Sequence, residues 1–345
     1  MNYKEILENV LKNGQPKQAV RFDSSGNPIP VSNGTIGTFC EIFRHDMSQG
    51  FPLSTLRRLP YKSTWVELEG FIKGITDKKW YKERNCHFWD EWANPVRVKE
   101  NLKNGIYFNE DDGSWLSTKE IELQVQSRTN DLGPIYGYQW RNFGEQYGEV
   151  NCEPFIEGGC CPATGEYQSI YTNINGIGYF GPDNGFDQLK TIVDRLKTNP
   201  YDRRMLCSAW NPNQLHLMGL PACHYSWGVV VYGNKLNLSW NQRSCDLILG
   251  VPQNITSYAT LQLLLCKESG LEPGELVGKL EDCHIYENLL PKAKELAERE
   301  ENELPTVEIL SKKDGSFSIF DWEYTDIKLD NYQHQGKMDM GSVTV

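Results

Sequence analysis

The chain has 345 residues, of which 39% are hydrophobic and 12% aromatic, so it is long enough to bury a large core. Charged residues make up 23% and no low-complexity tract dominates, which excludes disordered and fibrous classes. An excess of 46 acidic over 35 basic side chains argues against a nucleic-acid-coating surface or an anionic membrane partner. The net negative charge does not exclude a small anionic ligand, because a few convergent arginines can bind such a ligand at one site.

The first predicted element is an amphipathic helix over residues 1–13. Its apolar face is formed by Ile6, Leu7, Val10 and Leu11, and the interleaved charges distinguish it from a signal peptide. No apolar run approaches the roughly 20 residues that cross a bilayer. We therefore expect a soluble, cytoplasmic protein.

Two polar, turn-rich segments, residues 96–130 and 145–182, are predicted to be surface insertions in a single domain spanning residues 1–345. The second segment holds three cysteines, Cys152, Cys160 and Cys161. These have neither a CxxC spacing nor a nearby histidine, so ordinary loop thiols are favoured over a zinc site. We expect no metal.

After the insertions the apolar spacing becomes regular. It predicts a helix from Phe186 that ends near Asn199-Pro200, and then a strand over 205–210. Gly233-Asn234 separates two alternating runs and predicts a β-hairpin. Helices over 255–267 and 287–300 precede strand-like segments toward the C-terminus. The predicted architecture is mixed α+β with a sizeable sheet.

Cys223 is the first candidate for chemistry, because it follows a loop and has His224 beside it. A thiolate is a strong nucleophile when cations stabilise it. Taken alone, a buried structural cysteine is the better interpretation of this pair.

Arginines strengthen the case for a reactive cysteine. Arg203-Arg204 lie in a tight loop, and Arg243-Ser244 follow the second hairpin strand. Guanidinium groups with a hydroxyl suit a phosphate dianion. The pattern indicates a nucleophile acting on a phosphorylated small molecule, and a cysteine hydrolase stays open.

Longer segments carry a specific resemblance. They are DLGPIYGYQWRNFG (131–144), DRRMLCSAWNP (202–212), LPACHYSW (220–227), NQRSCDLILGVPQNITSYA (241–259) and EDCHIYENLL (281–290). Together they resemble thymidylate synthase over nearly the whole chain outside the two insertions. The resemblance implies an α+β fold with a large mixed sheet flanked by helices, and a homodimer with sheets packed back to back. It also implies 5,10-methylenetetrahydrofolate as co-substrate.

The resemblance assigns roles to matching residues. Cys223 would add to C6 of the pyrimidine, Glu67 would relay protons, Tyr136 would lie near the C5 proton, and Asp246 would bind the pterin. The remaining folate-side positions are Trp89, Trp92, Gly250 and Gln253.

The nucleotide contacts also follow from the resemblance. The phosphate cradle would comprise Arg21, Arg243, Ser244 and, from the second subunit, Arg203 and Arg204. His284 and Tyr286 would bind the sugar hydroxyl. Asn254 suits uracil, whereas an aspartate there suits cytosine, so the implied substrate is dUMP.

Several positions differ from the thymidylate synthase pattern, and these differences bear on which product the reaction gives. Glu69 and Gly70 stand where Leu and Trp are expected, and Gln253 replaces an aromatic residue. A polar wall would hold a water, which favours a dUMP hydroxymethylase, an enzyme suited to certain bacterial viruses. The valine-ended tail GSVTV favours the alternative, an ordinary thymidylate synthase. A non-catalytic nucleotide-binding homologue is the alternative of another class, and no role for nucleic acid is expected.

Overall fold

The computed structural model describes residues 1–18, 20–22, 27–30, 33–103, 126, 129–145, 147, 169–173, 176–179 and 185–339. Their contacts divide the chain into two compact units. The first contains Met1–Trp65, Asn199–Arg204 and Cys223–Val345, and the second contains Val66–Thr198 and Met205–Ala222. The single-domain interpretation stays a prediction. Most of both predicted insertions lies outside the described residues, as do Cys152, Cys160, Cys161 and the tail GSVTV.

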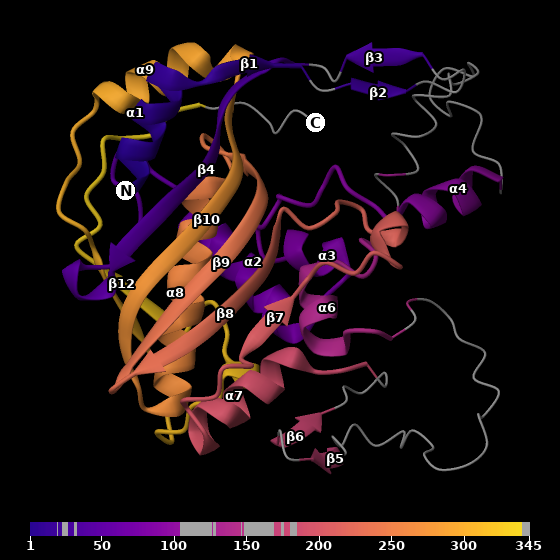
Figure 1. The fold of residues 1–345 in the computed structure, drawn as a ribbon, viewed down its shortest axis with the longest axis vertical. Helices are drawn as coiled ribbons and strands as arrows, with labels where there is room; N and C mark the ends of the chain where they lie inside the picture. Colours follow the sequence, from indigo (N-terminus) through magenta and orange to yellow (C-terminus); the bar gives the residue numbers. More distant parts are fainter. Residues whose placement is uncertain are drawn as a thin grey trace. The chain divides into compact units, whose positions relative to one another are not determined.

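A mixed sheet forms the centre of the first unit (Figure 1). Its strands follow the order β1 (Gln15–Lys17), β4 (Thr35–Asp46), β10 (Glu272–Tyr286), β9 (Lys235–Asp246) and β8 (His224–Tyr232). Strand β10 runs antiparallel to β4 and parallel to β9, and β8 and β9 form an antiparallel hairpin. The predicted α+β class with a large mixed sheet is confirmed.

The β8–β9 hairpin follows directly from its sequence. Gly233 takes φ +60° in the turn, a conformation that costs glycine little. Leu236, Leu238 and Trp240 are buried while the residues between them are less so, as the alternation predicts. Strand β8 begins at His224 and β9 ends at Asp246, and both carry polar side chains at this end of the hairpin.

Helices flank this sheet, with α8 (Val251–Ser269) packed on β9 and β10 and α1 (Tyr3–Asn13) packed on β4. Helix α8 begins a turn before the predicted range, because Pro252 fits the first turn of a helix. The predicted N-terminal helix is confirmed, and Ile6, Leu7 and Val10 are fully buried. The other elements of this unit are β2 (Val20–Phe22), β3 (Pro28–Pro30), η1 (Met47–Gln49), η3 (Glu287–Leu289), α9 (Leu290–Glu298), β11 (Thr306–Ile309), η4 (Ile319–Asp321) and β12 (Ile327–Asp330).

The sheet leaves apolar side chains uncovered in the first unit. Phe39 and Tyr232 are 87% and 75% exposed, and Ile42 and Val230 are 39% and 46% exposed. On β8, Val230 and Tyr232 alternate with buried residues, so they point away from the core. An apolar face of this kind indicates a protein contact.

The second unit is mainly helical and takes in the later part of α2 (Tyr61–Lys73). Arg141 of α6 (Tyr136–Asn142) forms an ion pair of 2.9 Å with the buried Asp187, which precedes α7 (Gln188–Thr198). The predicted strand over 205–210 shortens to β7 (Leu206–Ser208), and the predicted helix after Phe186 is confirmed as α7 (Gln188–Thr198). The other elements are α3 (Lys78–Lys82), α4 (Pro95–Lys103), α6 (Tyr136–Asn142), β5 (Ser169–Asn173), β6 (Gly176–Tyr179) and η2 (Leu215–Leu217). Among the described helices of either unit, none has the length and apolar character needed to span a membrane.

Candidate active site

Three neighbouring strands of the first unit bring polar residues to one end of the sheet. Arg243 of β9 donates its backbone N–H to the carbonyl oxygen of Cys223, which immediately precedes β8, at 2.9 Å. His284 of β10 stands opposite Asp246 of β9, and Ser244 lies between the two β9 positions. The structure therefore gathers five predicted site residues that are up to 61 positions apart in the sequence.

Cys223 is partly exposed, as a nucleophile must be, whereas its neighbour His224 is buried. The His224 ring nitrogen Nδ1 lies 2.9 Å from the hydroxyl of Tyr258. Burial lowers the pKa of His224 to about 3, so the ring is neutral near pH 7. His224 thus supplies no positive charge to the thiol, and its role is to anchor the start of β8 to α8.

Asn254 lies in the first turn of α8 and is partly exposed. Its side-chain oxygen Oδ1 accepts a hydrogen bond of 3.0 Å from Nε2 of Gln242. Because Gln242 belongs to β9, the Asn254 amide is tied to the same strand that carries Arg243 and Ser244.

Asp246 has one satisfied and one unsatisfied oxygen. Its Oδ1 accepts hydrogen bonds from the backbone N–H groups of Ile248 at 2.8 Å and Leu249 at 3.1 Å. Its Oδ2 is buried and has no hydrogen-bond partner within the described ranges. Burial raises the pKa of this carboxyl group. A buried acceptor of this kind calls for a donor from a ligand or water. Nearby, Gln253 donates its Nε2 to the Leu249 carbonyl at 2.9 Å, and Gly250 caps α8.

His284 is held by its own strand. Its Nδ1 lies 3.0 Å from the carbonyl oxygen of Asp282, which makes Nδ1 the donor and leaves Nε2 for another partner. Burial alone would lower the pKa of His284, but the neighbouring Asp282 and Asp246 raise it. The hydrogen bond with His284 lowers the pKa of Asp282 to about 2, and Lys17 also contacts Asp282. Tyr286 packs edge-on against His284 at 5.3 Å.

Of the arginines predicted to bind the phosphate, Arg243 alone belongs to the group of five residues at the end of the sheet. Arg203 and Arg204 are exposed, and Arg204 bonds the buried Asp202 through its backbone N–H at 2.9 Å and Nη1 at 3.2 Å. Arg21 belongs to strand β2, and its side chain lies outside what the structure describes.

In the second unit, Glu67 of α2 accepts a hydrogen bond of 2.9 Å from Nε1 of Trp89. Burial raises the pKa of Glu67 to about 7, and the Trp89 bond opposes part of this rise. A carboxyl group with this pKa exchanges protons readily near neutral pH.

Aromatic side chains pack around Trp89, the hydrogen-bond partner of Glu67. Phe71 stacks on Tyr136 at 4.8 Å, and the rings of Trp89 and Tyr136 lie 6.0 Å apart. Trp92 is partly exposed, and its carbonyl accepts a hydrogen bond of 3.0 Å from Lys78. Four predicted residues, Glu67, Trp89, Trp92 and Tyr136, therefore belong to this unit.

Glu69 and Gly70 also lie on α2, in the second unit. Two residues along an α-helix correspond to a rotation of about 200°, so Glu69 projects from the side opposite Glu67. Its carboxylate is buried and forms an ion pair of 2.6 Å with Lys73. At Gly70 a Cβ atom would lie 2.3 Å from the Tyr81 ring, so Tyr81 occupies the space that a larger side chain would need.

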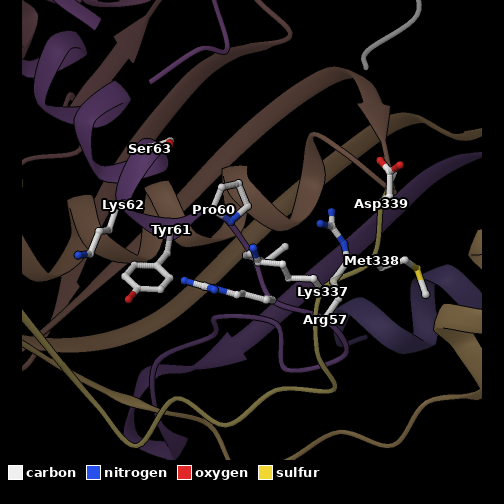
Figure 2. A pocket seen from close by; sticks show the side chains of 10 residues that line it. Arg57, Pro60, Tyr61, Lys62, Ser63, Lys337, Met338 and Asp339 are labelled. Atoms are coloured by element: carbon white, nitrogen blue, oxygen red, sulfur yellow. The ribbon is translucent and has the colours of Figure 1, made fainter. Parts of the chain in front are cut away.

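A cavity of about 590 Å³ lies elsewhere in the first unit, and Figure 2 shows its lining side chains. Four of the ten lining residues are cationic. Tyr332 fixes the adjoining backbone by donating to the carbonyls of Ser54 at 2.9 Å and Arg57 at 3.1 Å. The charged lining residues are Arg57, Arg58, Lys62, Lys337 and Asp339.

Sequence reasoning missed the residues that orient the site. Gln242 and Tyr258 lie within a segment that carried the resemblance, but their bonds to Asn254 and His224 join different elements. Arg57 was missed too, because it lies outside the segments that carried the resemblance.

Comparison with known proteins identifies the family. The thymidylate synthase family model matches residues 1–344. A thymidylate synthase of Mycoplasma pneumoniae is 32% identical over 96% of each chain. Thymidylate synthases of Listeria monocytogenes serotype 4b and Listeria innocua are also 32% identical, over 96% of this chain and 95% of theirs. Within the described ranges no group of His, Cys, Asp and Glu side chains is arranged to hold a metal ion. The chain therefore belongs to the thymidylate synthase family, a family of one-carbon transferases that use methylenetetrahydrofolate as co-substrate.

Proposed function

We propose that this protein is a thymidylate synthase, which methylates C5 of dUMP to give dTMP and dihydrofolate. The observation that carries the proposal is the gathering of Cys223, Arg243, Ser244, Asp246 and His284 at one end of the sheet. The relatives that match along almost the full chain are also thymidylate synthases.

The nucleotide is activated at C6. The Cys223 thiolate forms a bond to C6, and the electron pair moves to C5, which becomes nucleophilic. Arg243 and Ser244 hold the phosphate, together with Arg21 and with Arg203 and Arg204 of a second copy. Asn254 pairs with the uracil edge, and His284 with Tyr286 binds the sugar hydroxyl.

The one-carbon unit is then transferred. The N10–methylene bond of the folate opens to give an N5 iminium, and C5 attacks its carbon. The C5 proton then leaves near Tyr136, and N5 departs as an amine, which leaves an exocyclic methylene. Hydride from tetrahydrofolate reduces this methylene to a methyl group as the C6–sulfur bond breaks. Glu67 relays protons in these steps, because burial brings its pKa to about 7. The unsatisfied Asp246 Oδ2 accepts an N–H from the pterin.

The cationic cavity suits the anionic end of the folate. Arg58, Lys62 and Lys337 line it, and the glutamate tail of a folate carries carboxylates. Arg57 is 5% exposed and is already held by the Ile248 carbonyl at 2.6 Å, so it shapes the cavity more than it reaches the ligand.

The working form is a homodimer, joined through the exposed apolar face of the sheet. Phe39, Ile42, Val230 and Tyr232 would be covered there. Dimerisation would also bring Arg203 and Arg204 to the partner's phosphate. A cytoplasmic location fits an enzyme with diffusible substrates.

A dUMP hydroxymethylase is the second candidate, favoured by Gln253 where an aromatic is expected and by the polar Glu69. The sequence-based preference for this reaction gains no support from the relatives, which are synthases. Glu69 is also paired with Lys73 and projects away from Glu67, so it is poorly placed to hold a water beside that group.

Dihydrofolate formation tests the proposal. Mixing the protein with dUMP and methylenetetrahydrofolate should produce dihydrofolate in amounts equal to the nucleotide consumed. Nucleotide consumption without dihydrofolate would favour the hydroxymethylase. If neither changes and 5-fluoro-dUMP forms no adduct at Cys223, the protein is a non-catalytic homologue.

A further inference from the structure

We propose that Trp240 is a specificity-determining positioning residue, which fixes the amide of Asn254 in the orientation that accepts uracil and rejects cytosine. This inference rests on the proposed function, since it assumes that Asn254 reads the base. Trp240 lies three positions from the nearest predicted site residue, Arg243, and no sequence motif singled it out.

Trp240 is itself immobilised. It is fully buried, and its ring is stacked on Tyr258 at 5.0 Å with an interplanar angle of 12°. Gly278 of β10 stands opposite it, where a Cβ atom would lie 2.3 Å from the indole. Phe43 packs at 5.8 Å on another side. The indole N–H therefore points in one fixed direction.

That N–H sets the orientation of Gln242. The Trp240 Nε1 donates to Oε1 of Gln242 at 3.1 Å, and an indole nitrogen can only donate. The amide oxygen of Gln242 must face Trp240, which turns its NH₂ group the other way. That NH₂ group donates to the backbone carbonyl of Ser244 at 3.0 Å. Because a carbonyl oxygen can only accept, this bond also requires the NH₂ group on that side.

Gln242 in turn sets the orientation of Asn254. Its Nε2 also donates to Oδ1 of Asn254 at 3.0 Å. The Asn254 NH₂ is then left to donate to O4 of uracil, while the second lone pair of Oδ1 can accept N3–H. Cytosine presents a donor at C4 and an acceptor at N3, so it requires the opposite amide orientation.

Rotating the Asn254 side-chain amide by about 180° would place its NH₂ group against the NH₂ group of Gln242. Relief would require Gln242 to turn as well, which would set its NH₂ against the Trp240 N–H and its oxygen against the Ser244 carbonyl. The cytosine-accepting state is therefore unfavourable in either arrangement, since it loses the bond between Gln242 and Asn254 or, if Gln242 turns too, its bonds to Trp240 and Ser244.

The test compares nucleotide affinities in the Cys223→Ser background, where binding is measured without chemistry. Trp240→Phe keeps the ring and removes the N–H, and it should lower the ratio of dUMP to dCMP affinity by about tenfold. Trp322→Phe is the matched control, because Trp322 is 1% exposed and its Nε1 has no hydrogen-bond partner in the described part of the chain. The control should leave the ratio unchanged, although either variant can lose stability.

Gln242→Glu is a second, independent variant. A carboxylate can still accept from Trp240 but cannot donate to Asn254, so the Asn254 NH₂ should turn toward it and expose its oxygen to the base. We expect preference to move toward dCMP by at least the shift seen for Trp240→Phe. An unchanged ratio in both folded variants overturns the inference while leaving the proposed function standing. If the Cys223→Ser parent binds neither nucleotide, the proposed function fails, and the inference fails with it.

Discussion

Among single residues, the thiol of Cys223 is the group on which the proposed reaction depends most. Cys223→Ser removes the nucleophile with little change in size, so turnover should fall below detection while dUMP still binds. Mass spectrometry should show an adduct with 5-fluoro-dUMP and methylenetetrahydrofolate on the native protein and none on the variant. Full activity in Cys223→Ser would refute the assigned nucleophile.

Glu67 gives a second residue-scale prediction, which concerns pH. Its pKa is raised from 4.5 to about 7 in the folded protein, so the folded state holds the proton more tightly than the unfolded chain. The contribution to stability is therefore fully present below pH 4.5 and is lost as the pH rises through about 7. Glu67→Gln should flatten this part of the profile in urea unfolding and should lower kcat by about 10²–10⁴. A profile identical to that of the native protein would contradict the assignment.

At the scale of elements, Gly70 and Tyr81 form a matched pair between α2 and α3. The Tyr81 hydroxyl donates to the Ile75 carbonyl at 2.9 Å, so its ring cannot move freely away from Gly70. Gly70→Ala should lower the free energy of unfolding by about 1–3 kcal/mol, despite the better helix propensity of alanine. Thermal or urea unfolding measures this loss.

A companion variant separates the contact from a general effect on the helix. Tyr81→Leu combined with Gly70→Ala should recover much of the lost stability, because the shorter side chain leaves room for the methyl group. If the double variant loses as much as the sum of the single variants, the two residues are not coupled.

The elements also show how far the sequence can predict this fold. The β8–β9 hairpin and helices α1 and α7 were predictable because their apolar spacing and turn residues agree with local rules. Strand β4 was not predictable from local rules, since Cys40 takes φ +60° inside it. Strand β10 is also irregular, because its pairing with β9 shifts register between Pro273 and Leu276. Such irregularities depend on neighbouring strands that lie far away in the sequence.

The candidate site was predictable in a different way. The positions of Cys223, Asn254 and Glu67 followed from motif resemblance, but their surroundings did not. The neutral state of His224, the ion pair of Glu69 and the hydrogen bond from Gln242 to Asn254 arise only when separate elements pack together. Hence the resemblance names candidate positions, whereas their hydrogen bonds and packing are visible only in the structure.

For the whole molecule, active sites built from both subunits of a dimer predict that two inactive variants can complement each other. If Arg203 and Arg204 serve the partner's phosphate, a Cys223→Ser subunit and an Arg203→Ala/Arg204→Ala subunit are each inactive as homodimers. A mixed dimer should recover one working site, so mixing the two variants under exchange conditions should restore roughly a quarter of native activity when subunits pair at random. No recovery in verified mixed dimers would place these arginines on their own subunit's site or outside it.

The most direct test of the central claim is the mass of the nucleotide formed from dUMP and methylenetetrahydrofolate carrying deuterium at C6. A thymidylate synthase transfers that label as hydride, so the account predicts dTMP with a singly deuterated methyl group and an equal amount of dihydrofolate. A hydroxymethyl product without deuterium, which takes up heavy oxygen from labelled water, would contradict the account and establish the hydroxymethylase reaction.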